Sequence, residues 1–156
     1  MRIVLVTGSA RRLGKCFIKR FAEAGDKVWV HYRSSEKEAK ALVTELTSEG
    51  YSARCLYADV SIREDVSKMM SIIKEEDGHL DVLINNVGLY ICGDILTYSV
   101  THFEQTIQSN LLGAYYCIHD ALQIMHDGGS IINIGYSGLN AQAAHTYNTA
   151  YVVSKL

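Results

Sequence analysis

The sequence IVLVTGSARRLG, residues 3–14, is an apolar run that breaks at once into a glycine-containing turn. Such a run, followed by a helical pattern, predicts a strand, a tight turn and the start of a helix. The free N–H groups and the dipole of a helix N-terminus suit a phosphate group. Gly8 permits the tight turn, Gly14 permits close packing of helix on strand, and Arg12 brings charge between them. We therefore expect a phosphate-binding turn here.

The rest of the chain repeats this alternation of apolar runs and helical patterns. Nearly continuous runs rich in Val, Ile and Leu are typical of parallel strands that are covered on both faces. The expected strands are Ile3–Thr7, Lys27–Tyr32, Tyr51–Ala58, Asp81–Asn85 and Ser130–Ile134. Repeated β-α units predict an α/β fold, a doubly wound parallel sheet with right-handed crossovers, in a single domain over residues 1–156.

Two helix starts are marked by capping boxes, in which a serine is followed three residues later by a glutamate. These boxes are Ser35 with Glu38 and Ser61 with Glu64. A long helix is expected over about residues 101–125, and a last helix is expected to begin near Thr146.

The composition is that of an ordinary globular protein. The chain has 156 residues, of which 48% are hydrophobic, and a net charge of −2, so it shows no general attraction to nucleic acid or membranes. No apolar stretch approaches the roughly 20 residues of a membrane span. Without a signal peptide before the first strand, we expect a cytoplasmic protein. The four cysteines are widely spaced, which favours reduced thiols over disulfides and argues against a metal site.

The end of the second expected strand indicates which dinucleotide would bind. Folds that bind NAD place a carboxylate there for the ribose 2′-hydroxyl. Residues 31–34 read HYRS and contain no carboxylate. Arg33 offers a fork for a 2′-phosphate and Ser34 offers a hydroxyl, while Arg11 or Arg12 could reach the same phosphate. The sequence therefore favours NADPH over NADH as the cofactor.

Further motifs follow the later strands in a fixed order. They are YADV with Asp59, LINNVG with Asn86 and Gly88, SNLLGAYYC with Asn110, and YVVSK with Tyr151 and Lys155. Together with TGSARRLG, this order and spacing resembles the short-chain dehydrogenase/reductase family over essentially the whole chain. The resemblance implies a Rossmann-type fold, oxidoreductase activity on a small-molecule substrate and, where the full fold is present, a homo-oligomer such as a dimer or tetramer.

The resemblance also implies which residues bind the cofactor. They are Gly8, Ser9, Arg11, Arg12, Leu13 and Gly14 in the first turn, Tyr32, Arg33 and Ser34 after the second strand, Asp59 and Val60 after the third, Asn86, Val87 and Gly88 after the fourth, and Tyr151 and Lys155. Among these, Asp59 and Val60 are expected at the adenine, whereas Asn86 and Gly88 are expected on the nicotinamide side.

Tyr151 and Lys155 are four residues apart and therefore share one face of a helix. A phenol with an ordinary pKa of about 10 is a poor acid near neutral pH, and a neighbouring ammonium stabilises its anion. The resemblance implies that Tyr151 protonates a carbonyl oxygen as hydride arrives from the nicotinamide. It implies that Lys155 also holds the ribose hydroxyls, and that Asn110 anchors a water relay to Lys155.

Two departures from the family pattern affect the expected site. Arg12 replaces the middle glycine of the family's T-G-x-x-x-G-x-G loop, as in the pteridine reductase branch, which prefers NADPH. The catalytic serine of the family, typically thirteen residues before the tyrosine, would fall on Gly138, but alignment of the fifth strand puts Tyr136 in its place. Ser137 is our candidate for the hydroxyl that binds the substrate oxygen, and Tyr136 is its rival.

These features predict an NADPH-dependent reductase of a small ketone or 3-oxoacyl compound. A pteridine- or dihydrofolate-type reductase acting on C=N is an alternative that ARRLG favours, although the aspartate usual in that branch near the serine position is missing. A catalytically silent NADP-binding module is the third reading. The chain has no proline and stops inside the Y-x-x-x-K helix, so we expect the C-terminal part of the fold to be missing. Either residues follow Leu156 or the chain is truly short, which would favour the silent module.

Overall fold

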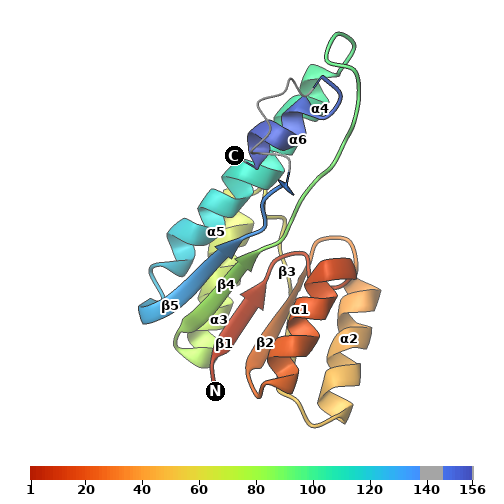
Figure 1. The fold of residues 1–156 in the computed structure, drawn as a ribbon. Coiled ribbons are helices and arrows are strands. Elements are labelled where there is room, and N and C mark those ends of the chain that lie inside the picture. Colours follow the sequence, from red (N-terminus) through yellow and green to blue (C-terminus); the bar gives the residue numbers. More distant parts are fainter. Residues whose placement is uncertain (138–145, 156) are drawn as a thin grey trace.

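A computed structural model describes residues 1–137 and 146–155, and in it a parallel five-stranded sheet is flanked by helices (Figure 1). The strands are β1 (Ile3–Val6), β2 (Lys27–Tyr32), β3 (Ala53–Tyr57), β4 (Leu80–Asn85) and β5 (Met125–Asn133). Their order across the sheet is β3-β2-β1-β4-β5, and every neighbouring pair is parallel. The predicted doubly wound sheet of the Rossmann type is confirmed.

The helices in the described residues are α1 (Arg12–Glu23), α2 (Glu36–Ser48), α3 (Arg63–Asp77), α4 (Val100–Ile107), the π-helical turn η1 (Gln108–Leu112), α5 (Gly113–Ala121) and α6 (Thr149–Ser154). Helix α6 packs beside α4 above the carboxyl ends of the strands (Figure 1). None of the helices in these ranges is long and apolar enough to cross a membrane.

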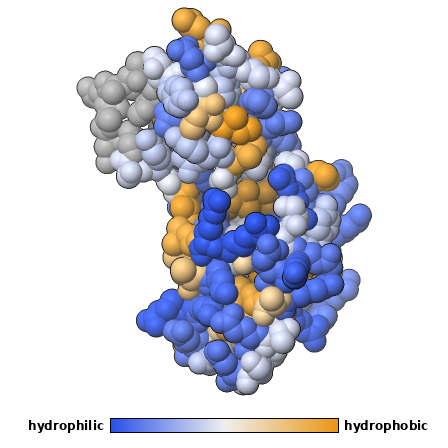
Figure 2. Space-filling view, turned by 90° about the vertical axis from the view of Figure 1, so that its right-hand side faces the viewer, coloured by the Kyte–Doolittle hydropathy of each residue, from blue (hydrophilic) through white to orange (hydrophobic). Residues whose placement is uncertain are grey.

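The core has two layers, because successive side chains of a strand point to opposite faces of the sheet. Val4 and Val6 of β1 pack with α1 and α2, whereas Leu5 packs with α3 and α5. The strands β1, β2 and β4 are therefore covered on both faces, which explains their nearly continuous apolar sequences. The outer surface on the side of α1 and α2 is largely hydrophilic, as expected for amphipathic helices (Figure 2).

The end of the long helix and the start of the fifth strand differ from the sequence prediction. The helix expected over residues 101–125 is interrupted by η1 and ends at Ala121. Strand β5 begins five residues early, because Met125 pairs with Leu80 across an irregularity before the regular ladder starts at Ser130. Met125 pairs with Leu80, and residues 126–129 form the irregularity before Ser130; the sequence of residues 125–129, MHDGG, has no strand pattern.

The two capping boxes predict where helices begin but not how their ends are bonded. Ser35 is the N-cap of α2, yet its hydroxyl accepts a hydrogen bond from Arg11 and caps no N–H of the helix. Helix α3 begins after Ile62, and the hydroxyl of Ser61 donates instead to Asp59 Oδ1 at 2.6 Å. The predicted side-chain caps are therefore wrong, because Ser35 bonds Arg11 of the first turn and Ser61 bonds Asp59 of its own loop.

The turn after β1 leaves no room for a side chain at Gly14. A Cβ atom there would lie 2.7 Å from the Gly8 carbonyl oxygen and from Ser9 Cα, and 2.8 Å from Asn86 Nδ2. Because two of these atoms belong to the backbone, they cannot move aside as a flexible side chain would. Glycine is therefore required for α1 to approach the strand ends this closely, as the sequence predicts.

We expect Gly14→Ala to lower the free energy of unfolding by about 2–3 kcal/mol, because the backbone of the turn must shift. Gly50→Ala is the matched control, since Gly50 has a φ of +88° with nothing within 4 Å of the added Cβ. Backbone strain alone should cost that control about 1 kcal/mol. Urea unfolding followed by circular dichroism measures both, and equal losses would contradict the crowding argument.

Candidate functional site

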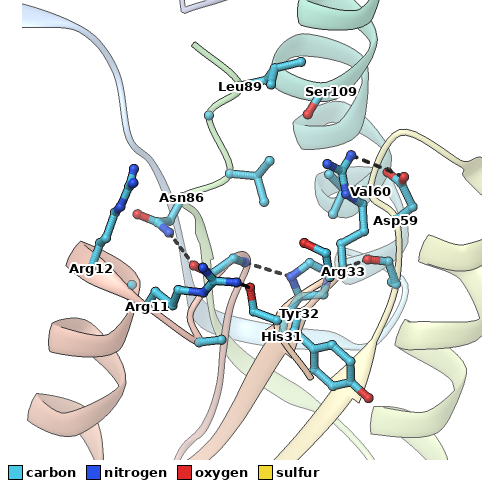
Figure 3. A pocket seen from close by; sticks show the side chains of 18 of the residues that line it. Arg11, Arg12, His31, Tyr32, Arg33, Asp59, Val60, Asn86, Leu89 and Ser109 are labelled. Atoms are coloured by element: carbon cyan, nitrogen blue, oxygen red, sulfur yellow. Dashed lines mark hydrogen bonds and ion pairs between the residues drawn. The ribbon is translucent and has the colours of Figure 1, made fainter. Parts of the chain in front are cut away.

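A cavity of about 380 Å³ lies at the carboxyl ends of the strands (Figure 3). The strand order reverses there, because β2 and β3 lie on one side of β1 and β4 and β5 lie on the other. Ligands of doubly wound folds bind at this kind of position. The cavity is lined by Gly8, Arg11, Arg12, Leu13, Gly14, Tyr32, Arg33, Ser34, Asp59, Val60, Asn86, Val87 and Gly88 from the predicted set, and by Ala10, His31, Ser35, Ala58, Leu89 and Ser109, which the sequence analysis did not assign to it. Residues far apart in the sequence thus meet in one hollow.

The backbone of the first turn is fixed by hydrogen bonds to the neighbouring strands. Gly8 has a φ of +63°, and its N–H donates to His31 Nδ1 at 2.8 Å. Asn86 Nδ2 donates to the carbonyl oxygens of Thr7 at 2.9 Å and Gly8 at 3.2 Å. The turn is therefore held from β2 on one side and from the end of β4 on the other.

Ser9 was expected to bind the cofactor but does not line the cavity. It is buried, and its hydroxyl accepts a hydrogen bond from the backbone N–H of His31 at 3.0 Å. Its own N–H donates to the carbonyl oxygen of His31 at 3.0 Å. Ser9 therefore joins the turn to the backbone of β2 through two hydrogen bonds with His31.

His31 joins three strand ends and was not predicted to do so. Its Nδ1 accepts from Gly8, so the ring proton is on Nε2, which donates to the Ala58 carbonyl oxygen at 3.0 Å. The ring is buried, and the loss of hydration lowers the pKa of His31 to about 4. A neutral imidazole with one donor and one acceptor is what these two partners require. The only sequence signal was its position near the end of a strand.

Three arginines surround the cavity and differ in their partners (Figure 3). Arg11 donates to the Ser35 hydroxyl and pairs with Glu38, whereas Arg33 lies 3.4 Å from Asp59 Oδ2. Arg12 has a φ of +51°, the left-handed conformation that favours glycine, and its guanidinium has no ion-pair or hydrogen-bond partner within residues 1–137 and 146–155. Arg12 thus has a backbone conformation that glycine adopts more easily than arginine does.

Asp59 accepts hydrogen bonds from the N–H of Ser61 at 3.0 Å and from its hydroxyl at 2.6 Å. Burial acts to raise the pKa of Asp59, but these bonds and Arg33 outweigh it, and the pKa lies below its ordinary value. The carboxylate is therefore charged at neutral pH and stays at the cavity wall.

Tyr151 and Lys155 do not line the cavity, but both lie beside Gly88, which does. Lys155 Nζ lies 6.0 Å from the centre of the Tyr151 ring and donates to the Val87 carbonyl oxygen at 3.1 Å. A Cβ atom on Gly88 would lie 3.7 Å from both Lys155 Nζ and Tyr151 Cε2. Burial lowers the pKa of Lys155, because its ammonium loses hydration. The segment after β4 therefore joins the cavity to the tyrosine–lysine pair.

Asn110 lies in the π-helical turn η1 and is buried. Its Oδ1 accepts from the N–H of Leu89 at 2.7 Å, while its Nδ2 donates to the carbonyl oxygen of Leu89 at 2.9 Å and to the Ser154 hydroxyl at 3.0 Å. These bonds tie the segment after β4 to α6. Isolated π-helical turns are frequent at functional sites, where the extra residue re-aims a side chain.

The two candidates for the substrate-binding hydroxyl lie differently with respect to Tyr151. The ring of Tyr136 is half-buried and meets the Tyr151 ring edge-on, with centres 5.7 Å apart. Tyr90 meets Tyr151 from another direction at 4.7 Å. Ser137 is exposed, and Gly138, the position given by counting back from Tyr151, lies outside the described residues. The structure thus brings Tyr136 into contact with Tyr151.

We expect the parent protein to lose stability as the pH falls from about 6.5 to about 4. The folded pKa of His31 is about 4 and the unfolded value about 6.5, so in this window the unfolded chain binds more protons. The full effect is about 3 kcal/mol, present above pH 6.5 and lost in acid.

His31→Gln keeps a donor and an acceptor but does not titrate. The difference in unfolding free energy between parent and variant, measured with urea at several pH values, cancels the contribution of the carboxylates. A difference that stays constant from about pH 7 to about pH 4 would contradict the assignment of this proton to His31.

Comparison with known proteins agrees with this geometry. Residues 2–156 match the family model described as short chain dehydrogenase. The chain is 31% identical over 155 residues to the 3-oxoacyl-[acyl-carrier-protein] reductase FabG of Staphylococcus aureus. The matched region covers 96% of this chain and 63% of that protein. It therefore spans less than two thirds of that relative's length.

Among solved structures of similar fold, two also resemble the chain in sequence and contain a bound nicotinamide cofactor. A blue fluorescent protein from a metagenomic library, in complex with NADPH, is 32% identical with a TM-score of 0.92 over 99% of this chain and 63% of that one. The landomycin C-6 ketoreductase LanV, with bound NADP and rabelomycin, is 29% identical with a TM-score of 0.89 over 99% of this chain and 64% of that one. With the family match over nearly all its residues, the chain belongs to the short chain dehydrogenase family.

Proposed function

We propose that this chain forms the cofactor-binding and catalytic part of an NADPH-dependent oxidoreductase that reduces the carbonyl of a small ketone or 3-oxoacyl compound. The observation that carries the proposal is the position of Gly88, which lines the cavity rimmed by arginines and lies beside Tyr151 and Lys155. The likeness to an oxoacyl reductase and to a ketoreductase supports the substrate class. Because those relatives are longer, the activity proposed is that of the whole protein.

The residues around the cavity fit a nicotinamide dinucleotide. The N–H groups of the first turn and the start of α1 suit the pyrophosphate, and Gly8 and Gly14 both line the cavity there. Arg33 and Ser34, with Arg11 or Arg12, would hold a 2′-phosphate. By family resemblance, Asp59 and Val60 would contact the adenine, and residues 86–88 would line the nicotinamide side. The bound cofactor would supply the hydride.

Proton transfer falls to Tyr151 in this proposal. Its phenol would donate a proton to the carbonyl oxygen of the substrate, and the nearby ammonium of Lys155 would stabilise the resulting phenolate. Lys155 would also hold the ribose hydroxyls, and Asn110 would anchor a water relay to it. Ser137 would hydrogen-bond the substrate oxygen, with Tyr136 as the alternative because its ring already touches Tyr151.

A pteridine- or dihydrofolate-type reductase, which acts on C=N, is the second candidate. It is favoured by Arg12, which occupies the position of the middle glycine at a φ of +51°. It is opposed by residues 134–137, which contain no aspartate. Steady-state rates with dihydropteridines and with simple ketones distinguish the two enzymes.

The preference for NADPH is tested by binding, without turnover. We expect adenosine 2′,5′-bisphosphate to bind more tightly than 5′-AMP, and Arg33→Ala to weaken only the bisphosphate, by about tenfold or more, because it removes a charge-assisted pair. Isothermal titration calorimetry measures all four constants. Equal affinity of the parent for the two nucleotides would contradict an NADPH preference.

Tyr151→Phe removes the proposed proton donor while keeping the ring. We expect the rate of NADPH oxidation in the presence of a ketone to fall by about 10²–10⁴-fold with NADPH binding retained. Tyr115→Phe on the outer face of α5 is the matched control and should keep the parent rate.

Two outcomes of this experiment would change the proposal, and two further variants extend it. Full activity of Tyr151→Phe would contradict the proposed chemistry. A parent that binds NADPH but oxidises none of it with ketones or dihydropteridines would favour the silent module. In an active parent, Ser137→Ala and Tyr136→Phe separate the two candidate hydroxyls, because only the loss of the one that binds the substrate should lower kcat.

A further inference from the structure

The residues that the sequence marks as a capping box both contact Arg11. Ser35 Oγ accepts a hydrogen bond from Arg11 Nη2, and Glu38 Oε1 lies 3.3 Å from Arg11 Nε. The side chain of Arg11 therefore crosses from the first turn to the start of α2. Arg11 and Ser35 both line the cavity, so this crossing runs along the cavity rim (Figure 3).

Glu38 forms an ion pair with the guanidinium of Arg11, a group that an anionic ligand in the cavity would also bind. A phosphate binds arginine through the same N–H groups that a carboxylate uses, and both ligands are negatively charged. Arg11 and Glu38 are 54% and 47% exposed, so water and ions reach the pair. A phosphate arriving at Arg11 must either displace Glu38 or bind beside its charge, and both cost affinity.

The second rim arginine, Arg33, also has a carboxylate partner, Asp59, but that carboxylate is held by other groups as well. Asp59 already accepts two hydrogen bonds from Ser61, at 3.0 and 2.6 Å, and its contact with Arg33 is longer, at 3.4 Å. Arg33 is 55% exposed, much as Arg11 is, so exposure does not separate the two pairs. Glu38 differs because no hydrogen bond other than its contact with Arg11 holds its carboxylate within the described part of the chain.

We infer that Glu38 competes with the 2′-phosphate of the cofactor for Arg11 and thereby sets how strongly the protein prefers a phosphorylated adenosine. This inference rests on the proposed function, since it takes the cavity to be a dinucleotide site. Glu38 is a specificity-determining residue that acts through Arg11 and need not touch the nucleotide.

The test compares Glu38→Gln with Glu36→Gln by calorimetric titration of the 156-residue chain with adenosine 2′,5′-bisphosphate and with 5′-AMP. Glu36 lies in the same turn of α2 and pairs with Lys40, so its variant removes the same charge without freeing Arg11. We expect Glu38→Gln to tighten the bisphosphate about three- to tenfold and to leave 5′-AMP within about twofold. Glu36→Gln should change either constant by less than about twofold.

Salt gives a second readout. The gain from Glu38→Gln should shrink as sodium chloride is raised from about 50 to about 500 mM, because exposed charges are screened. Unchanged or weaker bisphosphate binding by Glu38→Gln would overturn the inference, as would an equal gain from Glu36→Gln.

These outcomes are separable from a failure of the proposed function. If the parent does not discriminate between the nucleotides but Glu38→Gln does, competition by Glu38 is supported while the parent's NADPH preference is contradicted. If neither protein discriminates, the inference is overturned. Loss of turnover in any variant has no bearing on it, because binding alone is measured.

Discussion

The hydrogen bond from the Gly8 N–H to His31 Nδ1 fixes the geometry on which the site depends. Through its other nitrogen the same ring bonds Ala58, so one buried neutral side chain connects the residues after β1 and β3 through β2. The bond holds Gly8 in a conformation with positive φ and leaves the rest of the turn free to face the cavity. A protonated imidazole has no acceptor, and the hydrogen bond cannot exist in that state.

The catalytic side of the site is held in a different way. Asn110 bonds both backbone groups of Leu89 and the Ser154 hydroxyl, which places the segment after β4 against α6. Lys155 adds a bond to the Val87 carbonyl oxygen. Buried amide and ammonium groups that satisfy backbone partners orient neighbouring segments, because leaving such groups unbonded is costly. Gly88 lies between Val87 and Leu89, which these bonds hold; it lines the cavity and lies beside Tyr151.

The sequence predicted the sheet and its cavity better than it predicted the side-chain partners around them. Apolar runs identified the strands because β1, β2 and β4 are buried on both faces, and glycines at positions 8 and 14 identified the turn. Residues 125–129 were missed because their sequence has no strand pattern, and the pairing of Met125 with Leu80 extends the strand across an irregularity. The roles of Ser9, His31 and Ser35 depend on contacts between segments more than 20 residues apart, about which local patterns carry no information.

The left-handed conformation of Arg12 has a consequence for how quickly an anion is captured. An arginine in this conformation costs about 1 kcal/mol relative to glycine, yet the chain keeps a cation there that is not neutralised by any carboxylate of the described residues. Its field extends into the solvent over about 8–10 Å at physiological ionic strength, whereas the fields of Arg11 and Arg33 are partly cancelled by their partners. Arg12 should therefore raise the rate at which a polyanion associates with the protein more than it lengthens the lifetime of the complex.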